Sequence, residues 1–360
     1  MNIVIRVDSS LEIGIGHFMR CLTLADTLRK FGSHVRFVCR HIMPQLNELL
    51  VKSEHDILLL EGKDPSILES ELEYVGWLGV NQEFDAIETL KVLAGSRWNW
   101  VIVDHYALDY RWEDIIKKGS AAKILVIDDL FDKRHICDIF LNQNVINNIE
   151  FLCDYKLPEN TIRLIGPRYA LLRDEFFTAR SKVEFRSGPI KNILVSFGGI
   201  DINNVTSKVL KAFSLDQELC VNIDVVIGAE HPCIDSIRTV CATKGYTCHV
   251  QPDKISELML AADLAIGAGG STSWERCCLA LPSVIISVAD NQVPIVQELD
   301  RAGAAMYLGN ESVITDKIIS KTLDELYDDN KRLFDMSNKA FDMVDGKGKD
   351  RVLENIITLQ

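Results

Sequence analysis

The sequence predicts an α/β protein of two doubly wound domains, each with a parallel sheet that helices cover on both faces. First, short continuous apolar runs alternate with segments of helical periodicity along most of the chain. Second, such uninterrupted runs are typical of strands buried on both faces of a parallel sheet. Third, 360 residues exceed one ordinary domain of about 150 residues, and 47% of hydrophobic residues suffices for two cores.

The first half of the chain repeats a strand, a polar or glycine-rich loop and a helix. The apolar runs cover residues 2–7, 35–39, 57–60, 101–103 and 124–127. Ligands of open parallel sheets bind beyond the carboxyl ends of the strands. The polar residues that follow these runs are therefore candidates for a site, namely Asp8, Asp104, His105, Asp128 and Asp129.

The second half resumes this alternation after a break between residues 151 and 189. Strands are expected at residues 193–197, 221–227, 264–266 and 283–288, and residues 315–360 have a helical pattern that breaks at 346–348. We therefore place a first domain at residues 1–165, a connection at 166–188 and a second domain at 189–360.

Composition and charge argue against several classes of protein. The net charge of −13 argues against general nucleic-acid binding, which needs a basic surface. The ten cysteines are scattered without a C-x-x-C pair, so we expect buried thiols rather than a zinc ribbon or a redox motif. We see no signal-peptide pattern and no apolar run near the roughly 18 residues of a membrane span, so we expect a cytoplasmic protein.

Two glycine-rich loops of the second half are candidates for binding a diphosphate. Gly198 and Gly199 follow one strand, and Gly267-Ala268-Gly269-Gly270-Ser271-Thr272 follows another and opens a helix. Glycine lets backbone N–H groups approach a ligand closely, and a helix N-terminus favours an anion. Ser271 or Thr272 either caps this helix or donates to phosphate. No G-x-x-x-x-G-K-[ST] sequence occurs, which argues against a P-loop nucleotidase.

Three polar residues near these loops each allow two interpretations. Glu275 lies one helical turn after Ser271, where a carboxylate either accepts hydrogen bonds from a ribose or stabilises the helix dipole. Asn291 and Gln292 begin a further helix, where their amides either bind sugar hydroxyls or cap the helix.

The loop Gly14-Ile15-Gly16-His17 opens the first helix but lacks the third glycine and the later acidic residue of a dinucleotide-binding fingerprint. His17 is a candidate general base, because the ordinary histidine pKa of about 6.5 suits proton transfer near neutral pH. The alternative is a histidine that only packs or caps the turn. The acids at the strand ends could form a metal or carboxylate cluster, bind sugar hydroxyls or cap helices, and no H-E-x-x-H or comparable metal spacing occurs.

Several of these motifs carry a resemblance to a known family. They are residues 6–22, with the block Gly14-x-Gly16-His17-x-Met19-Arg20-Cys21, and residues 103–106, 127–129, 196–199, 270–277 and 290–292. Together they resemble the UDP-sugar hydrolases of pseudaminic acid biosynthesis, which act on UDP-2,4-diacetamido-2,4,6-trideoxy-β-L-altropyranose. The block around His17 is specific, whereas a double-glycine loop is shared more widely, and the tail after Gly309 matches weakly.

The resemblance implies a GT-B architecture, in which two Rossmann-like domains face a cleft, UDP lies on the C-terminal domain and the sugar faces the N-terminal one. It implies that His17 is the catalytic base, that water attacks the anomeric carbon with inversion, and that neither a metal nor another cofactor is needed. Asp8, Asp104 and His105 are expected to contact the sugar or orient His17. The expected substrate contacts are Asp8, Gly14, Gly16, Arg20, Asp104, His105, Tyr106, Gly198, Gly199, Gly270, Ser271, Thr272, Glu275, Asn291 and Gln292.

Other functions stay open from the sequence. They are a GT-B glycosyltransferase with an acceptor other than water, a non-catalytic nucleotide-sugar binding protein and a hydrolysing sugar-nucleotide epimerase. We expect the protein to bind a UDP-sugar, and we expect it to bind neither nucleic acid nor a membrane. We expect a monomer, although the sequence does not determine the oligomeric state.

Overall fold

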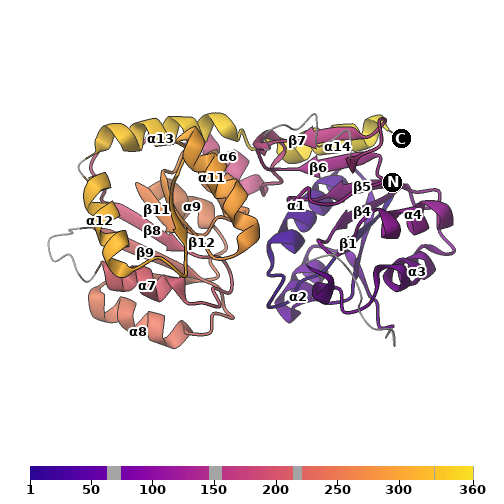
Figure 1. Ribbon diagram of the computed structural model, residues 1–360, viewed down its shortest axis with the longest axis horizontal. Coiled ribbons are helices and arrows are strands. Elements are labelled where there is room, and N and C mark those ends of the chain that lie inside the picture. The colour runs from indigo at the N-terminus through magenta and orange to yellow at the C-terminus, as the bar shows by residue number, and fades with distance from the viewer. Residues whose placement is uncertain (63–73, 146–155, 214–220, 328, 360) are drawn as a thin grey trace. The chain divides into compact units, whose positions relative to one another are not determined.

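The computed structural model describes residues 1–62, 74–145, 156–213, 221–327 and 329–359. The chain divides into two compact units, which we call unit 1 (Met1–Leu171 with Lys347–Gln360) and unit 2 (Leu172–Gly346) (Figure 1). Each unit has a parallel sheet with helices packed on it and a hydrophobic core. The predicted fold class, α/β with two doubly wound domains, is confirmed.

Unit 1 is built around seven parallel strands in the order β3-β2-β1-β4-β5-β6-β7. The strands are β1 (Asn2–Val7), β2 (His34–Cys39), β3 (Asp56–Leu59), β4 (Trp100–Asp104), β5 (Lys123–Ile127), β6 (Ile139–Asn142) and β7 (Ile162–Ile165). Its described helices are α1 (Gly16–Lys30), α2 (Pro44–Lys52), α3 (Gln82–Leu93), α4 (Tyr110–Gly119) and α14 (Gly348–Thr358), with the 3₁₀ turns η1 (Val75–Trp77) and η2 (Pro167–Tyr169).

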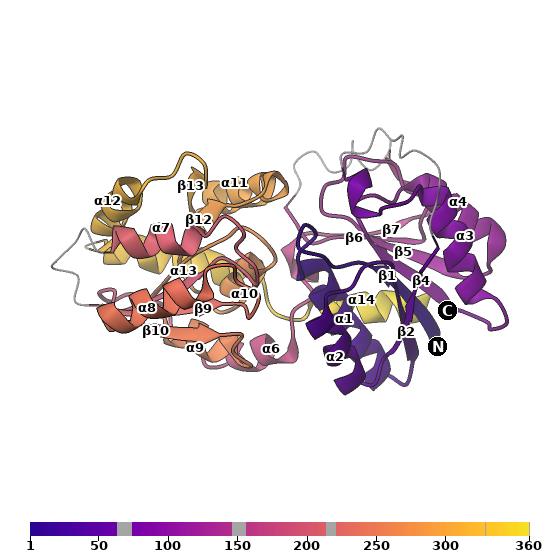
Figure 2. The ribbon, with the colours of Figure 1, turned by 90° about the horizontal axis from the view of Figure 1, so that it is seen from below.

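Alternate residues of the central strands of unit 1 face two layers of helices. On one face, Val4 and Val38 belong to a buried cluster that also contains Trp112 of α4. On the other face, Phe37 of β2 packs against Phe18 of α1, with ring centroids 5.3 Å apart. Helix α1 contacts β1 and β2 on this face and lies beside α14 (Figure 2).

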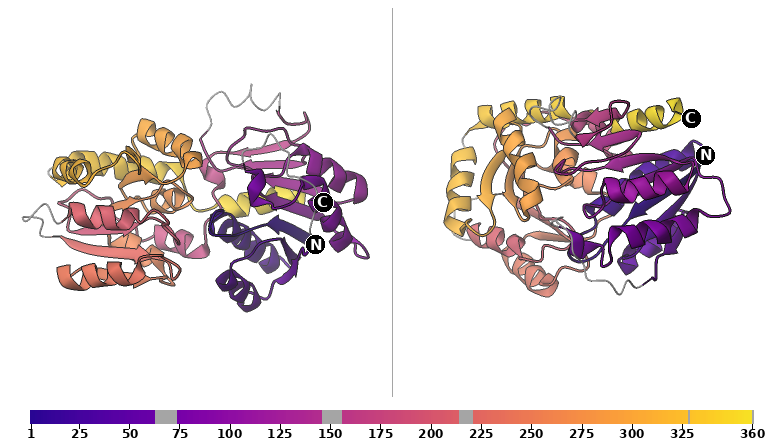
Figure 3. Two further views of the ribbon diagram at one scale, coloured as in Figure 1. Left: turned by 60° about the horizontal axis from the view of Figure 1, so that its bottom comes forward. Right: turned by 45° about the vertical axis from the view of Figure 1, so that its right-hand side comes forward.

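Unit 2 has six parallel strands in the order β10-β9-β8-β11-β12-β13. Helices lie along this sheet (Figure 3). The strands are β8 (Asn192–Ser196), β9 (Asn222–Ile227), β10 (Thr247–Val250), β11 (Leu264–Gly267), β12 (Ser283–Ser287) and β13 (Met306–Asn310). The described helices are α6 (Asp174–Arg180), α7 (Val205–Ala212), α8 (Ile234–Lys244), α9 (Ile255–Ala261), α10 (Thr272–Cys278), α11 (Val293–Ala302), α12 (Asp316–Tyr327) and α13 (Asn330–Met343), with the 3₁₀ turn η3 (Asp290–Gln292). In the core of this unit, Ile193 and Val195 of β8 pack with Val209 of α7 and Ile237 of α8.

Four strands have no counterpart in the sequence prediction, namely β6, β7, β10 and β13. They are only four or five residues long, polar residues interrupt β7 and β10, and the apolar runs of β6 and β13 span only three residues. Their strand conformation follows from pairing with a longer neighbour in the sheet, which a local pattern does not reveal.

The predicted domain boundary needs a correction at the C-terminus. We expected residues 189–360 to form one domain, but residues 347–360 belong to unit 1. The chain leaves unit 2 at Gly346, and α14 then packs against α1 and η2. Gly348 lies so close to the backbone of η2 that a Cβ atom there would come within 2.2 Å of the Ala170 carbonyl oxygen.

The cysteines mostly behave as core residues, as predicted. All cysteines in the described ranges are free thiols, and six of them are buried, namely Cys21, Cys39, Cys137, Cys241, Cys277 and Cys278. Cys153 and Cys220 lie outside the described residues. Among the described helices, none has both the length and the apolar character needed to cross a membrane.

A buried cluster of charges joins the end of β5 to α4. His135 lies 2.6 Å from Glu113 Oε1 through Nδ1 and 3.3 Å from Asp128 Oδ2 through Nε2. Lys133 Nζ donates to Asp128 Oδ1 at 3.2 Å. Burial lowers the pKa of His135, but Glu113 and Asp128 outweigh burial and raise this pKa to about 9. Asp128, one of the strand-end acids, is thereby committed to contacts within the protein.

We expect this cluster to lose its stabilising effect at alkaline pH. The pKa of His135 is about 9 in the folded chain and about 6.5 in an unfolded one. The contribution to stability is therefore complete below about pH 6.5 and disappears as the pH rises through 9. Chemical denaturation of the wild type and of His135→Gln at about pH 6 and about pH 9.5 measures this effect. The stability difference between the two proteins should shrink by at least about 1 kcal/mol at the higher pH, and a constant difference would contradict a protonated His135.

Candidate functional site

Three neighbouring strands bring predicted site residues of unit 1 to one edge of its sheet. Strands β1, β4 and β5 are adjacent and parallel, so the residues that end or follow them gather at their carboxyl ends. Asp104 ends β4, while Asp8 follows β1 and Asp129 lies just after β5. Residues 8–15 connect β1 to α1, so α1 begins at this same edge.

The loop before α1 is a tight turn that sets where the helix begins. Gly14 donates its N–H to the carbonyl of Ser10 at 2.8 Å and has φ +76°, a conformation that favours glycine. The Ser10 hydroxyl oxygen accepts the N–H of Ile13 at 3.1 Å. Gly16 is the first residue of α1, which puts His17 in the first helical turn. Gly14 therefore shapes the loop that presents His17.

One face of α1 holds three side chains against the carboxylate of Asp104. His17, Arg20 and Cys21 are spaced i, i+3 and i+4, which places them on the same side of the helix. His17 Nδ1 lies 2.6 Å from Asp104 Oδ1. Arg20 donates from Nε to Oδ2 at 2.6 Å and from Nη2 to Oδ1 at 2.7 Å, and Cys21 Sγ lies 3.5 Å from Oδ2. This shared partner explains the spacing of the three residues in the sequence block.

Asp104 is an anion that determines which nitrogen of His17 carries a proton. Burial raises the pKa of Asp104, but Arg20 and then His17 outweigh burial and hold this pKa well below its usual range. A contact of 2.6 Å with an anionic oxygen requires a proton on His17 Nδ1. Arg20 Nη2 also lies 3.1 Å from Nδ1, but both groups then carry protons, so this contact is not a hydrogen bond. Among the described residues, no side-chain hydrogen bond involves His17 Nε2. Neutral His17 therefore offers the lone pair of Nε2 to a ligand.

Aromatic rings pack around His17. The ring of Tyr106 meets the imidazole edge-on, with centroids 4.5 Å apart. Trp77 in η1 stacks on Tyr106 at 5.6 Å, and its ring centroid lies 6.4 Å from that of His17. Tyr106 thus lies beside His17. Trp77 was not selected from the sequence, because it belongs to no motif there and only the fold brings it to His17.

Asp129 completes this cluster, although it was not among the expected substrate contacts. Its Oδ2 accepts hydrogen bonds from Arg20 Nη1 at 2.5 Å and from the Tyr106 hydroxyl at 3.1 Å. Its Oδ1 is buried and has no hydrogen-bond partner within the described residues. A buried carboxylate oxygen without a donor is costly, and a ligand hydroxyl would satisfy it.

Asp8 and His105 belong to the interior rather than to an accessible site. The Asp8 side chain is fully buried and accepts hydrogen bonds from Arg6 at 2.6 and 2.9 Å, and also from the backbone N–H of Arg40 at 2.7 Å. His105 Nδ1 accepts the backbone N–H of Ala107 at 3.1 Å, and burial lowers the pKa of His105. The contacts of Asp8 are therefore made within the protein, whereas His105 Nε2 is buried 3.3 Å from Asp8 Oδ2 without a hydrogen-bond partner among the described residues. Asp104, rather than either of them, orients His17.

Glycine is needed in unit 2 because backbones approach each other closely at the carboxyl ends of its strands. Gly198, directly after β8, has φ +90°. A Cβ atom on Gly228 would lie 1.8 Å from the carbonyl oxygen of Gly199. A Cβ atom on Gly267 would lie 2.3 Å from the carbonyl oxygen of Ser196. Both predicted glycine loops therefore lie at the same edge of this sheet, since β8 and β11 are neighbours.

The predicted polar residues of unit 2 lie around the second loop. Gln292 Oε1 accepts the N–H of Gly269 at 3.2 Å, and its Nε2 would lie 3.9 Å from a Cβ atom on Gly270. Gln292 therefore supports the loop. The neighbouring Asn291 has a buried Oδ1 without a partner in the described part of the chain. Ser271 is exposed and makes no side-chain capping bond to α10, so this capping alternative is not realised.

Thr272 is the first residue of α10 and is half-buried, and Glu275 lies one turn further along this helix. Glu275 Oε1 lies 3.4 Å from Arg173 Nη2, and 15% of the Glu275 side chain is exposed. Burial raises the pKa of Glu275, and Arg173 opposes this rise. The contact with Arg173 adds a third interpretation, an ion pair, to the two that the sequence left open.

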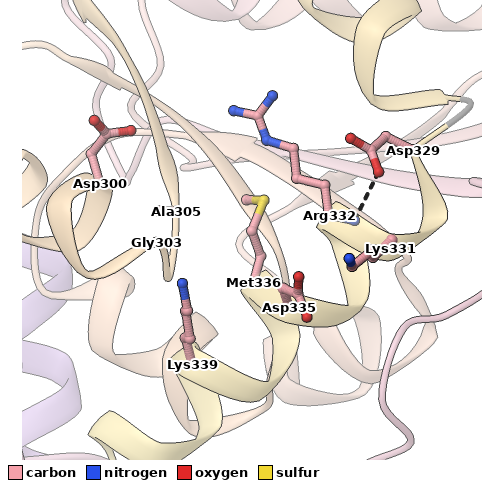
Figure 4. Close-up of a pocket in the computed structure, with 9 residues that line it drawn as sticks. All are labelled: Asp300, Gly303, Ala305, Asp329, Lys331, Arg332, Asp335, Met336 and Lys339. Atoms are coloured by element: carbon pink, nitrogen blue, oxygen red, sulfur yellow. Dashed lines mark hydrogen bonds between the residues drawn. The ribbon is translucent and has the colours of Figure 1, made fainter.

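A cavity elsewhere in unit 2 does not coincide with these residues. Its lining is highly charged, and Figure 4 shows Lys339 pointing toward Gly303 and Arg332 beside Asp329. None of the predicted site residues lines this cavity. Among the described residues, no three His, Cys, Asp or Glu side chains are grouped as metal ligands.

The sequence has relatives among proteins of sugar metabolism. It is 24% identical over 356 residues to the spore coat polysaccharide biosynthesis protein SpsG of Bacillus subtilis, covering 98% of this chain and 96% of that protein. It is 30% identical over 213 residues to the UDP-2,4-diacetamido-2,4,6-trideoxy-β-L-altropyranose hydrolase of Campylobacter jejuni, covering 58% of this chain and 64% of that protein. An uncharacterised protein of Methanocaldococcus jannaschii is 27% identical over 368 residues, which is 100% of this chain and 66% of that protein. The chain thus spans slightly less than two thirds of the length of two of these relatives.

The family comparison and the solved structures agree on the architecture. Residues 193–352 match the glycosyltransferase family 28 C-terminal domain. The structure of Phytolacca americana UGT2 in complex with UDP-2-fluoro-glucose and pterostilbene superposes with a TM-score of 0.69 at 12% identity, over 99% of both chains. Acinetobacter baumannii MurG superposes with a TM-score of 0.64 at 14% identity, also over 99% of both chains. The chain therefore has the GT-B fold, and its second half is related to the C-terminal domain of family 28 glycosyltransferases.

Proposed function

We propose that this protein hydrolyses a UDP-linked sugar and that His17 is the general base that activates the water. The observation that carries this proposal is the pair of His17 and Asp104, in which the carboxylate holds Nδ1 at 2.6 Å and leaves Nε2 available. A histidine oriented by a buried carboxylate is a recurrent arrangement for proton abstraction. The family 28 match over residues 193–352 supports a sugar nucleotide as the substrate.

The reaction would proceed by direct displacement at the anomeric carbon. Water loses a proton to His17 Nε2 while its oxygen forms a bond to the anomeric carbon. The bond between that carbon and the oxygen of the β-phosphate breaks, and its electron pair leaves with UDP. The configuration inverts because water and UDP lie on opposite faces of the sugar. Asp104 stabilises the imidazolium that forms, and the proton then passes to solvent.

The other side chains near His17 would bind the sugar. Asp129 Oδ1, buried and without a donor in the described chain, would accept a sugar hydroxyl or amide N–H. Arg20 fixes both Asp104 and Asp129 through three hydrogen bonds of 2.5 to 2.7 Å, so it would hold the base and this acceptor in a constant geometry. The rings of Trp77 and Tyr106 would contact apolar parts of the sugar.

Unit 2 would bind the nucleotide. Gly198 and the loop that begins at Gly267 would offer backbone N–H groups to the diphosphate at the carboxyl ends of β8 and β11. Glu275 would accept hydrogen bonds from the ribose. UDP is a good leaving group, so we propose neither a catalytic acid nor a metal ion.

The finer proposal is that the sugar is a 2,4-diacetamido-2,4,6-trideoxyhexose, as in pseudaminic acid biosynthesis. The 30% identity to the Campylobacter jejuni hydrolase supports it, as does the resemblance of the block around His17 to that family. The family 28 match favours a second candidate, a glycosyltransferase that transfers the sugar to an acceptor other than water. Incubating the protein with several UDP-sugars in the absence of an acceptor, and measuring UDP release, separates the two. UDP release from a diacetamido sugar supports hydrolysis, whereas release only after an acceptor is added would favour transfer.

We expect His17→Ala to lower the turnover number for UDP release by at least about two orders of magnitude, the usual contribution of a general base. UDP affinity should change little, because the proposed nucleotide contacts are in unit 2. The matched control is His34→Ala, which removes a half-exposed histidine of unit 1 that pairs with Asp56. Steady-state kinetics and calorimetric titration with UDP measure both effects, and near-normal turnover in His17→Ala would exclude it as the base.

We expect Glu275→Ala to weaken UDP binding by at least about tenfold, because hydrogen bonds from ribose hydroxyls to a carboxylate contribute roughly 1.5–3 kcal/mol each. The control is Glu175→Ala, which removes the other carboxylate of Arg173, at 2.7 Å. If Glu275 only pairs with Arg173 or stabilises the helix dipole, the Glu275→Ala substitution will change the melting temperature and leave UDP affinity unaltered. Calorimetric titration and thermal melts of the two variants decide between these roles.

A further inference from the structure

Arg276 is a buried cation with few compensating interactions. Only 2% of this residue is exposed. In the described chain its guanidinium forms hydrogen bonds through Nη2 alone, to the carbonyl of Ala268 at 2.7 Å and to Ser273 Oγ at 3.0 Å. Its Nε is buried without a partner there. Burial lowers the pKa of Arg276 to about 10, and it lowers the pKa of Arg186, another buried arginine of unit 2, to about the same value, so the two residues differ in their hydrogen-bond partners rather than in this shift.

A second buried arginine of unit 2 shows the contrast. Arg186 donates to the carbonyls of Ala262 at 3.1 Å, Leu279 at 2.6 Å and Met259 at 2.9 Å, so all three of its nitrogens have acceptors. Such an arrangement explains Arg186 as a structural residue that joins α9 to the end of α10. Arg276 lacks comparable acceptors, and packing within the protein does not explain why a charge is kept at its position.

The place of Arg276 supplies an explanation. The side chain reaches back from α10 to the loop that begins at Gly267. A Cβ atom on Gly267 would lie 2.9 Å from Arg276 Nη1, and Nη2 holds the carbonyl of the next residue, Ala268. The carboxylate next to it in the sequence, Glu275, lies 3.4 Å from Arg173. The positive charge therefore lies against the backbone of the loop, without an ion pair to Arg276 among the described residues.

We propose that Arg276 is the counter-charge of the diphosphate that this loop binds, acting through the loop as a positioning residue rather than by direct contact. The inference rests on the proposed function, because it takes a nucleoside diphosphate as the ligand. A bound anion would offset the buried charge, and attraction between charges is strong where water is excluded. The hydrogen bond to Ala268 would also turn the loop so that its N–H groups face the phosphates.

The test compares the binding of UDP, which carries the diphosphate, with the binding of uridine, which lacks it. Calorimetric titration gives the affinities of the wild type, Arg276→Met and Arg276→Lys for UDP and for uridine. We expect Arg276→Met to weaken UDP binding by at least about tenfold while uridine binding changes by less than about twofold. Arg276→Lys keeps the charge and should retain the ratio of the two affinities within about threefold. If Arg276→Met does not fold, Arg276→Gln, which keeps a donor for Ala268, is measured instead with the same expectation.

The control is Arg186→Met, which should lower the melting temperature and leave the ratio of UDP to uridine affinity unchanged. An unchanged ratio in Arg276→Met would overturn the inference, because a purely structural arginine affects both ligands alike. A folded Arg276→Lys variant in which the ratio of UDP to uridine affinity falls as in Arg276→Met would also overturn the inference, since the positive charge would then be irrelevant. A wild type that binds neither UDP nor uridine would instead overturn the proposed function, so the two failures are distinguishable.

Discussion

The carboxylate of Asp104 is the interaction on which the candidate site of unit 1 depends. This one group binds His17, Arg20 and Cys21 and thereby fixes the rotation of α1 about its own axis. A buried carboxylate is tolerated only when its oxygens are saturated by donors, and α1 supplies these donors from a single face. The same contacts set the proton of His17 on Nδ1. The contacts that dock the helix onto the sheet therefore also orient the imidazole of His17.

The rest of this sheet edge is held by charges as well. Arg6 of β1 connects Asp8 to Asp85, and Arg40, which directly follows β2, also donates to Asp85. None of these four side chains has more than 5% exposure, so the network belongs to the interior. Removing one partner of a buried ion pair costs about 3–5 kcal/mol, because the other charge is left uncompensated. The side chains of such a network are therefore held in one arrangement. A rigid support is what the His17 geometry requires.

The surface of unit 2 that we propose for the nucleotide is built differently. Its strand ends carry glycines where a Cβ atom would collide with a neighbouring carbonyl, so its backbone can approach a ligand closely. Gln292 and Arg276 hold the loop from the protein side. Residues 193–352 match the family 28 C-terminal domain, and the nucleotide site that we propose is the same for a hydrolase and for a transferase. The two candidate functions would therefore differ in the acceptor that reaches unit 1, which is water in a hydrolase and another molecule in a transferase.

The sequence by itself determined the features that follow from local spacing. Apolar runs revealed the longer strands, glycines marked the loops at their ends, and the i, i+3, i+4 spacing of His17, Arg20 and Cys21 reflects one helix face. Only the tertiary structure decided which acid meets His17, because Asp8 and Asp104 have equivalent positions after strands. Asp8 accepts a hydrogen bond from Arg6, whereas Asp104, 87 residues from His17 in the sequence, accepts one from the His17 imidazole. Contacts between segments that are distant in the sequence, which no local pattern encodes, decided four further features. They are the place of Trp77 near His17, the unpaired Asp129 Oδ1, the packing of α14 in unit 1 and the lack of an ion pair to Arg276 among the described residues.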